Sequence, residues 1–268
     1  MAGRYTRNLV GTLGILTAVA AASMAGAPQA SADEGKVRKG LAMALGGGTA
    51  HAWVAMGPDG KAEMLGVSMS EAAMRDIGSL HDTALVLPLP AEAADTGFDH
   101  VLLNWNPHGH PPAEVYGSPH FDIHFYTVPS HEREAVSEAD PEFRAKAARH
   151  PPAGFIPENY IPPEPDPVPG MGLHWVDANT PELHGATFTH TLIYGTWDGK
   201  VTFVEPMVAK TVFDMRETVV APVKQPALVA EPGRYPTRYR IDFDPNAAEH
   251  RIVLEGFEAR SVDLATRN

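Results

Sequence analysis

The fold is decided by one run of eight residues, Pro119-His120-Phe121-Asp122-Ile123-His124-Phe125-Tyr126. Its aromatic and branched side chains are typical of a β-strand, and together with the residues up to Pro129 they predict a strand over residues 120–128. Side chains alternate between the two faces of a strand, so His120, Asp122 and His124 share one face. The three side chains that alternate with them, Phe121, Ile123 and Phe125, are aromatic or aliphatic and suit a core. The run therefore predicts a strand that separates an apolar core from a histidine-rich polar face.

A loop with two further histidines comes just before this strand. It contains Pro107, His108, Gly109, His110, Pro111 and Pro112. Prolines and a glycine at this spacing are typical of a loop, which can fold back over the strand. Much later in the chain, His174 stands between glycine-containing backbone and Trp175, a position that suits a pocket.

These histidines and the aspartate suggest a metal site. Imidazole nitrogens and carboxylate oxygens are common zinc ligands, and the motif contains no cysteine or methionine that would favour a softer metal. We predict a divalent metal, zinc in the first place, with the candidate ligands His108, His110, His120, Asp122, His124 and His174. The same face is also compatible with a hydrogen-bonded imidazole–carboxylate network that holds no ion.

A second local signal is the Asp198-Gly199 pair between two β-type runs, residues 187–196 and 201–207. Asp-Gly at such a position predicts a two-residue hairpin, in which residue 192 would face residue 205. His190 and Glu205 would then form a diagonal pair on one face. Glu205 is the candidate general base of a metal site with three ligands and a water. The alternative for His190 is an ordinary polar residue on a wet strand face.

The rest of the chain predicts a β-rich α+β single domain with an antiparallel sheet or barrel-like core and a few short helices. Hairpins are expected at both ends, around Pro58-Asp59-Gly60 and around Asp244-Pro245-Asn246. We place the domain at residues 48–257, after a flexible lead at 33–47 and before a tail at 258–268. Residues 151–172 contain many prolines and predict a long loop that wraps this domain.

The N-terminus and the composition bear on location. Residues 1–32 have the pattern of a cleaved secretory signal peptide, with Arg4 and Arg7 before an apolar run and Ala30-Ser31-Ala32 at its end. An uncleaved membrane anchor is the alternative. The chain has 33 acidic against 21 basic residues and no cysteine. This balance argues against nucleic acid and anionic membrane surfaces as partners, and it leaves no disulfide to stabilise a secreted protein.

Three blocks carry a resemblance, namely Trp105 to Tyr126, Met171 to Trp175, and Tyr194 to Met207. Together they resemble an uncharacterised family of secreted bacterial proteins that includes a ring-forming Thermus protein controlled by an extracytoplasmic (envelope-stress) sigma factor. The resemblance covers roughly residues 48–257. It implies a β-rich α+β domain and a ring-shaped homo-oligomer, but it implies no reaction. The positions that match the family pattern are His108, His110, Pro119, His120, Asp122, His124, Tyr126, His174, Glu205 and Pro206.

Three functions are compatible with these patterns. The first is a metal site, structural if four protein ligands close it, and hydrolytic or lyase-like if a water completes it. The second is a metal-free enzyme that uses the histidines and carboxylates as acids and bases, although no G-x-S-x-G motif accompanies them. The third is a non-catalytic oligomeric or ligand-binding protein of the cell envelope, in which the aromatic residues near the histidines line a small-molecule pocket.

One further motif offers an architectural alternative. His108-Gly109-His110 followed by Glu114 imitates the start of the metal motif of cupin β-barrels. The glycine expected further along that motif is missing, so the imitation is incomplete.

Overall fold

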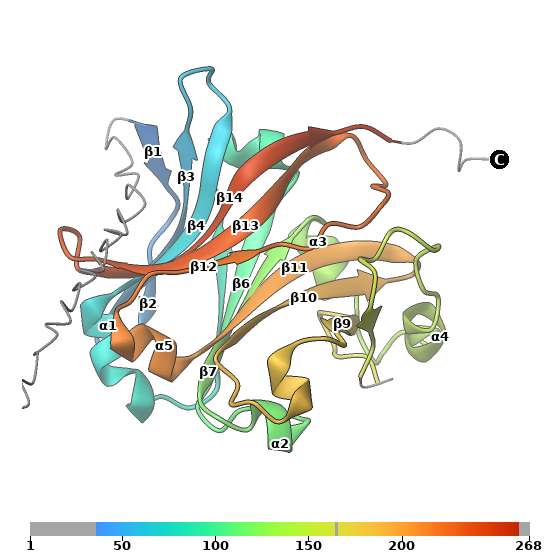
Figure 1. Ribbon diagram of the computed structural model, residues 1–268, viewed down its shortest axis with the longest axis horizontal. Helices are drawn as coiled ribbons and strands as arrows, with labels where there is room; N and C mark the ends of the chain where they lie inside the picture. Colours follow the sequence, from blue (N-terminus) through green and yellow to red (C-terminus); the bar gives the residue numbers. More distant parts are fainter. Residues whose placement is uncertain (1–35, 164–165, 263–268) are drawn as a thin grey trace, which may run out of the picture. The chain divides into compact units, whose positions relative to one another are not determined.

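Two antiparallel sheets make up the described part of the chain, which comprises residues 36–163 and 166–262 of the computed structural model. The expected signal peptide and the ends of both termini lie outside these residues. The first sheet has the strand order β1-β3-β4-β14-β13-β12, with β2 beside β3 (Figure 1). Its strands are β1 (Val37–Lys39), β2 (Met43–Leu45), β3 (Gly48–Met56), β4 (Ala62–Ser70), β12 (Val219–Pro222), β13 (Gly233–Asp244) and β14 (Glu249–Arg260).

The second sheet has the order β5-β6-β7-β11-β10-β9-β8. Its strands are β5 (Thr83–Pro88), β6 (His100–Asn106), β7 (His120–Tyr126), β8 (Tyr160–Ile161), β9 (Leu173–Asp177), β10 (His190–Trp197) and β11 (Lys200–Ala209). The strand predicted from the opening run is β7, which lies in the interior of this sheet between β6 and β11. Its position gives it neighbours on both sides that can contribute side chains to the polar face.

The helices are short and lie in the connections between strands. They are α1 (Glu71–Asp76), α2 (Ala113–Tyr116), α3 (Ser130–Glu134), α4 (Phe143–Ala147) and α5 (Lys210–Met215), with three 3-10 turns at Ile77–Ser79, Ala91–Thr96 and Pro181–His184. The prediction of a β-rich α+β domain with antiparallel sheets and a few short helices is therefore confirmed. Of the described residues, no helix has both the length and the apolar character that a membrane span requires.

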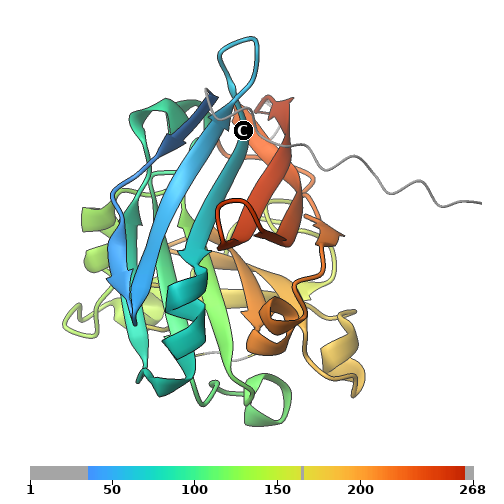
Figure 2. The same ribbon diagram turned by 90° about the vertical axis from the view of Figure 1, so that its left-hand side faces the viewer.

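The core lies between the two sheets. Phe121, Ile123 and Phe125 of β7 are fully buried and belong to one apolar cluster with side chains of the first sheet, including Leu65 and Ile252. Figure 2 shows β3 and β4, in blue, in front of the green strands of the second sheet. Burying one such side chain contributes about 1.5–3 kcal/mol, so the apolar face of β7 is fixed against the first sheet. Its polar face must then point away from that sheet.

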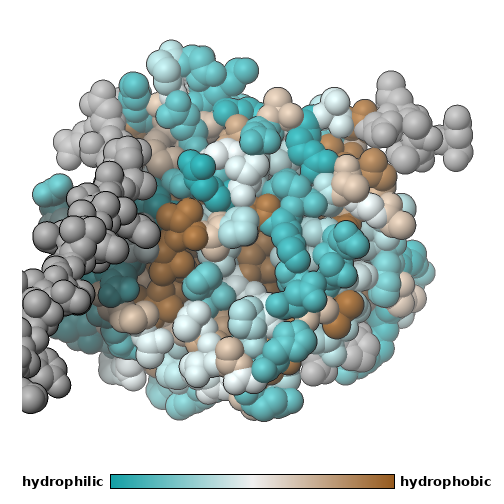
Figure 3. All heavy atoms as spheres, viewed as in Figure 1, coloured by the Kyte–Doolittle hydropathy of each residue, from teal (hydrophilic) through white to brown (hydrophobic). Residues whose placement is uncertain are grey.

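Loops and short helices cover this polar face. Tyr116 of α2 packs beside His110, Phe188 packs on the ring of His120, and the hydroxyl of Tyr126 donates to the carbonyl of Gly170. Gly170 belongs to the long proline-rich segment, so this segment contacts β7 at Tyr126. Figure 3 shows that apolar atoms on the viewed face of the molecule occur in small separate groups, as is common for folded proteins.

Two predicted boundaries differ from the structure. The expected flexible lead contains β1 and β2, which both pair with β3. These are short strands that are held by the hydrogen bonds of a neighbour and need no strong pattern of their own. The expected tail begins too early, since β14 continues to Arg260, where it pairs with Gly233 of β13.

The register of the β10–β11 hairpin also differs. Trp197 pairs with Lys200 as predicted, but the register shifts between Gly195 and Thr196, so that Ile193, and not Leu192, faces Glu205. One extra residue on one strand moves all later side chains to the opposite face. The predicted diagonal pair of His190 and Glu205 is therefore wrong. His190 faces the first sheet, where its Nδ1 lies 2.7 Å from the hydroxyl of Tyr239.

Candidate metal centre

The polar face of β7 is buried although it carries ionisable groups. His120, Asp122 and His124 are at most 6% exposed. Buried ionisable groups are costly unless they are paired or bind an ion. Each of them therefore has to be accounted for by its neighbours, and the neighbours divide into two groups.

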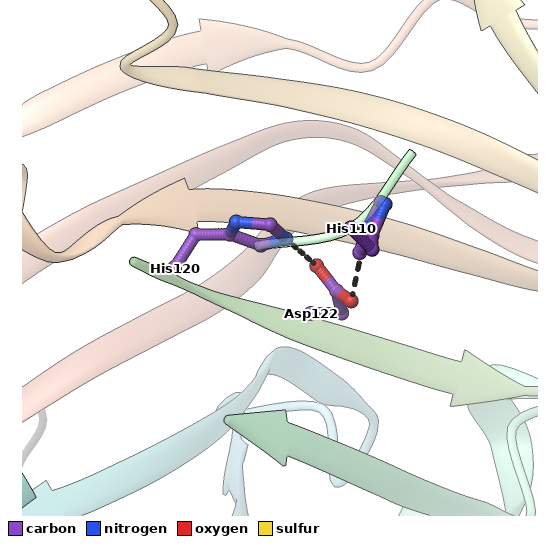
Figure 4. Close-up of side chains that lie close together, drawn as sticks. All are labelled: His110, His120 and Asp122. Atoms are coloured by element: carbon purple, nitrogen blue, oxygen red, sulfur yellow. Dashed lines mark ion pairs between the residues drawn. The ribbon is translucent and has the colours of Figure 1, made fainter. Parts of the chain in front are cut away.

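The first group, the aspartate triad, consists of His110, His120 and Asp122. Figure 4 shows Asp122 between the two imidazoles. Nε2 of His120 lies 3.1 Å from Oδ1 of Asp122, and Nε2 of His110 lies 3.4 Å from Oδ2. One oxygen of the carboxylate thus faces each imidazole.

The loop before β7 brings His110 to this position. Gly109 has a φ of +65°, and a Cβ there would lie 2.1 Å from the carbonyl oxygen of Tyr116. The next residue, His110, donates its backbone N–H to that same carbonyl. Only glycine suits this close approach, and the turn it makes carries the His110 side chain back over the strand.

Backbone carbonyls orient both imidazoles of this triad. Nδ1 of His120 donates to the carbonyl of Ser118 over 2.7 Å, and Nδ1 of His110 donates to that of Pro111 over 2.8 Å. A carbonyl only accepts, so Nδ1 carries the proton and, in a neutral ring, Nε2 carries the lone pair. Asn106 adds a third contact, because its amide donates to Oδ2 of Asp122 over 2.7 Å. Such contacts from outside the ligand set orient the ligands in protein metal sites.

The second group, the glutamate triad, consists of His124, His174 and Glu205. Glu205 lies on β11 between Val204 and Met207, which pair with Phe125 and Asp122, so its side chain stands beside that of His124. Oε2 of Glu205 lies 3.4 Å from Nε2 of His124 and 3.7 Å from Nε2 of His174.

His174 reaches this triad from β9 across β10. It pairs with Gly195, where a Cβ would lie only 2.0 Å from the ring of Phe203. Since Gly195 has no side chain, the imidazole of His174 extends over β10 toward Glu205. Nδ1 of His124 lies 3.3 Å from the carbonyl of Leu102, so this ring, like those of the aspartate triad, directs Nε2 at a carboxylate oxygen.

The two triads differ in electrostatics. Burial favours the neutral acid of Asp122, but the imidazoles of His110 and His120 outweigh it and hold the pKa of this carboxyl below its usual range. Asp122 in turn overcomes the effect of burial on His110 and raises the pKa of that imidazole. The imidazoles on either side of Asp122 therefore stabilise the negative charge of its carboxylate.

In the glutamate triad, burial dominates the pKa of every group. Burial lowers the pKa of His124 to about 4 and that of His174 to about 3. Burial, together with the negative charge of Asp122, raises the pKa of Glu205 well above its usual value. The two imidazoles are therefore neutral near pH 7, and the environment of Glu205 favours the neutral form of its carboxyl.

Four ligand atoms of the two triads are buried without a hydrogen-bond partner in the described part of the chain, namely His120 Nε2, Asp122 Oδ1, His124 Nε2 and Glu205 Oε2. The first two lie 3.1 Å apart and the last two lie 3.4 Å apart. Buried polar atoms without partners are rare in folded proteins. Two imidazoles and one carboxylate in each triad match the donor set of a divalent metal.

The predicted ligands are thus distributed unequally. Five of the six lie in the two triads, and the candidate base, Glu205, lies among the ligand atoms. His108 is exposed and belongs to neither triad, and Glu114 is exposed as well. The His108 and Glu114 pattern that imitates a cupin motif is therefore not assembled here.

One contributor to the site was not predicted. Asn106 stands directly opposite His120 in the β6–β7 register, and its amide holds Asp122. The sequence contains a signal for it, because residues 98–105 predict the neighbouring strand, and pairing the two strands would have placed Asn106 on the polar face.

Comparison of the chain with protein-family models, with curated proteins and with solved structures found no match.

Proposed function

We propose that this protein binds a divalent transition-metal ion, zinc in the first place, at the glutamate triad of His124, His174 and Glu205. The observation that carries the proposal is the convergence of two imidazole nitrogens and one carboxylate oxygen, within 4.8 Å of one another, from three different strands. Two of these atoms, His124 Nε2 and Glu205 Oε2, are buried without a hydrogen-bond partner among the described residues.

Burial supports this assignment. Glu205 is 1% exposed, and among the described residues its neighbours in ion-pair range are the imidazoles of His124 and His174, with no lysine or arginine. A buried carboxyl without a hydrogen bond costs free energy, and a divalent cation would remove that cost by accepting lone pairs from all three groups. Because His124 and His174 are held neutral, their lone pairs are free to bind a metal without first losing a proton.

Three protein ligands indicate a site with chemistry. Structural zinc sites are usually closed by four protein ligands, whereas two histidines and a glutamate plus water form a catalytic type of zinc site. A bound metal would lower the pKa of that water to about 7 and polarise a substrate carbonyl or phosphoryl oxygen. We therefore propose a metal-dependent hydrolase or lyase. In this proposal Glu205 is a ligand, so it does not serve as the general base that its sequence position suggests.

Elemental analysis and titration test the metal. Protein purified without added metal is analysed for zinc, iron, manganese and copper, then stripped with a chelator and titrated with Zn²⁺ by calorimetry. His174→Ala removes the most accessible ligand, and His108→Ala is the matched control because His108 is exposed and outside the triads. We expect the control to bind like the wild type and His174→Ala to lose binding at this site. Equal affinities in all three proteins would refute the proposal.

A substrate screen tests the chemistry. Ester, lactone, glycoside and phosphoester substrates are offered to metal-loaded, stripped and His174→Ala protein. We expect turnover only in the loaded wild type and the His108→Ala control. Metal binding without turnover on any substrate class would leave the binding site in place and remove the catalytic half of the proposal.

A further inference from the structure

We infer that the aspartate triad of His110, His120 and Asp122 is a second divalent-metal site, separate from the glutamate triad, so that one chain binds two ions. This goes beyond the proposed function, which needs only the glutamate triad. The two sites share the strand β7, where Asp122 and His124 are two residues apart, a spacing of about 7 Å along a strand.

Both ring nitrogens of each imidazole in this triad already face a polar neighbour. Nδ1 of each ring donates to a backbone carbonyl, and Nε2 of each ring faces the carboxylate. An acid–base histidine needs a nitrogen that faces its substrate. Here all ring nitrogens are directed at the backbone or at the space beside Asp122, as for ligands of a common ion.

One oxygen of the Asp122 carboxylate lies close to an imidazole nitrogen without a hydrogen bond between them. Nε2 of His120 and Oδ1 of Asp122 are 3.1 Å apart, which is within hydrogen-bond range, yet neither atom has a hydrogen-bond partner within the described residues. Both atoms are deeply buried, since His120 is 0% and Asp122 is 6% exposed. A metal that binds both atoms would satisfy two such neighbouring, unpartnered atoms.

Asn104 adds a further oxygen atom on the face that carries Asp122. Asn104 of β6 pairs directly with Asp122, so its side chain lies on the same face. Its Oδ1 is buried and has no hydrogen-bond partner among the described residues. A carboxamide oxygen is a ligand that divalent ions accept, and it would complete a site of two imidazoles, one carboxylate and one amide. Asn106 would hold the carboxylate from outside this set.

The two sites differ in how firmly their ligands are held. The His110 side chain is 35% exposed and comes from a loop, whereas the glutamate triad takes all its ligands from strands. Ligands on strands are positioned more rigidly than ligands on loops. The two ions also repel each other across a short distance. We therefore assign the weaker of two binding steps to the aspartate triad.

Metal stoichiometry in four proteins tests the second site. Stripped wild type, His110→Ala, His174→Ala and the His108→Ala control are titrated with Zn²⁺, and the bound metal is measured after gel filtration. We expect two equivalents in the wild type and the control, and one equivalent in each of the other two. Co²⁺ binding, followed by visible absorption, should show two steps in the wild type and a single, different step in each triad variant.

The outcomes separate the two proposals. One equivalent in the wild type that persists in His110→Ala and disappears in His174→Ala would overturn the second site and leave the first intact. One equivalent that both variants lose would mean a single shared ion and would also overturn it. Asp122→Asn serves as the second variant for this triad, and circular dichroism of each stripped variant shows whether it is folded before the metal is counted.

Discussion

The aspartate triad and the glutamate triad contain the same kinds of groups, two imidazoles and a carboxylate, on one face of one sheet. Their environments differ. Asp122 receives a hydrogen bond from Asn106 and lies between two imidazoles that favour its ionised form. Oε2 of Glu205 has no such donor among the described residues, and burial favours the neutral form of this carboxyl. The difference shows that the neighbours of a ligand set, more than its chemical composition, decide its charge before any metal binds.

This difference has a consequence for stability. A carboxylate that is stabilised by its neighbours contributes to the fold without metal, whereas a buried carboxyl without partners does not. The aspartate triad should therefore support the metal-free protein, and the glutamate triad should be stabilised mainly by an ion. Variants of the two carboxyls and of their neighbours test this contrast.

Replacing the carboxylate of the aspartate triad should give the largest loss of stability. Asp122→Asn removes the negative charge beside the buried imidazole of His120 and the partly exposed imidazole of His110. Breaking a buried pair in this way costs about 3–5 kcal/mol. Glu205→Gln is the matched comparison and should cost less, because burial already favours the neutral form of the Glu205 carboxyl. Chemical denaturation in the presence of a chelator measures both. Similar losses in the two variants would contradict the contrast.

Replacing Glu205 should weaken metal binding strongly, although it has little effect on the stability of the stripped protein. Glu205→Gln replaces a charged ligand by a neutral amide, and the loss should exceed the roughly 10–100-fold that the removal of a mere supporting contact costs. Calorimetric titration of stripped protein with Zn²⁺ measures the affinity of the stronger site, with His108→Ala as the control. An unchanged affinity in Glu205→Gln would show that Glu205 is not a ligand.

The contact from Asn106 should matter to one triad only. Asn106→Ala removes the hydrogen bond to Oδ2 of Asp122, so we expect about 10–100-fold weaker binding of the second equivalent of metal. The first equivalent should bind as in the wild type, because the Asn106 amide donates its hydrogen bond to the carboxylate of the aspartate triad. If both steps weakened equally, the two triads would behave as one site.

The strand at the centre of the site could be predicted because its signal is local. The alternation over residues 120–126 shows which side chains share a face, and the apolar set lies fully buried against the first sheet. The same alternation cannot show which strands lie beside it. Glu205 and His174 join His124 only because the sheet order is β7-β11-β10-β9.

Two other features depend on single backbone positions that periodicity does not reveal. The bulge beside Gly195 adds one residue to the β10–β11 register and turns His190 toward the first sheet. The left-handed turn at Gly109 decides that His110, and not His108, reaches Asp122. Secretion, ring assembly and the resemblance to a Thermus family concern location and partners, and they stay predictions.

The smallest expected effect concerns a buried imidazole outside both triads, which serves as a reference for them. His250 of the first sheet packs against Phe243 and Phe213, and burial lowers its pKa. Its folded-state pKa lies below the unfolded value of about 6.5, so folding favours the neutral ring. Burial of the neutral His250 ring costs no protonation free energy above about pH 6.5. As the pH falls from there toward the folded-state pKa, the unfolded chain gains a proton that the folded protein does not, and the free energy of unfolding decreases.

We therefore expect His250→Phe to flatten the decrease of the unfolding free energy between pH 7 and pH 5 in stripped protein. His131→Phe is the control, since His131 is exposed, and it should keep the wild-type slope. The slope that remains in His250→Phe comes from other groups, the two triads among them. A slope identical to that of the wild type would mean that His250 does not contribute to it, and that burial of an imidazole alone does not make this fold sensitive to acid.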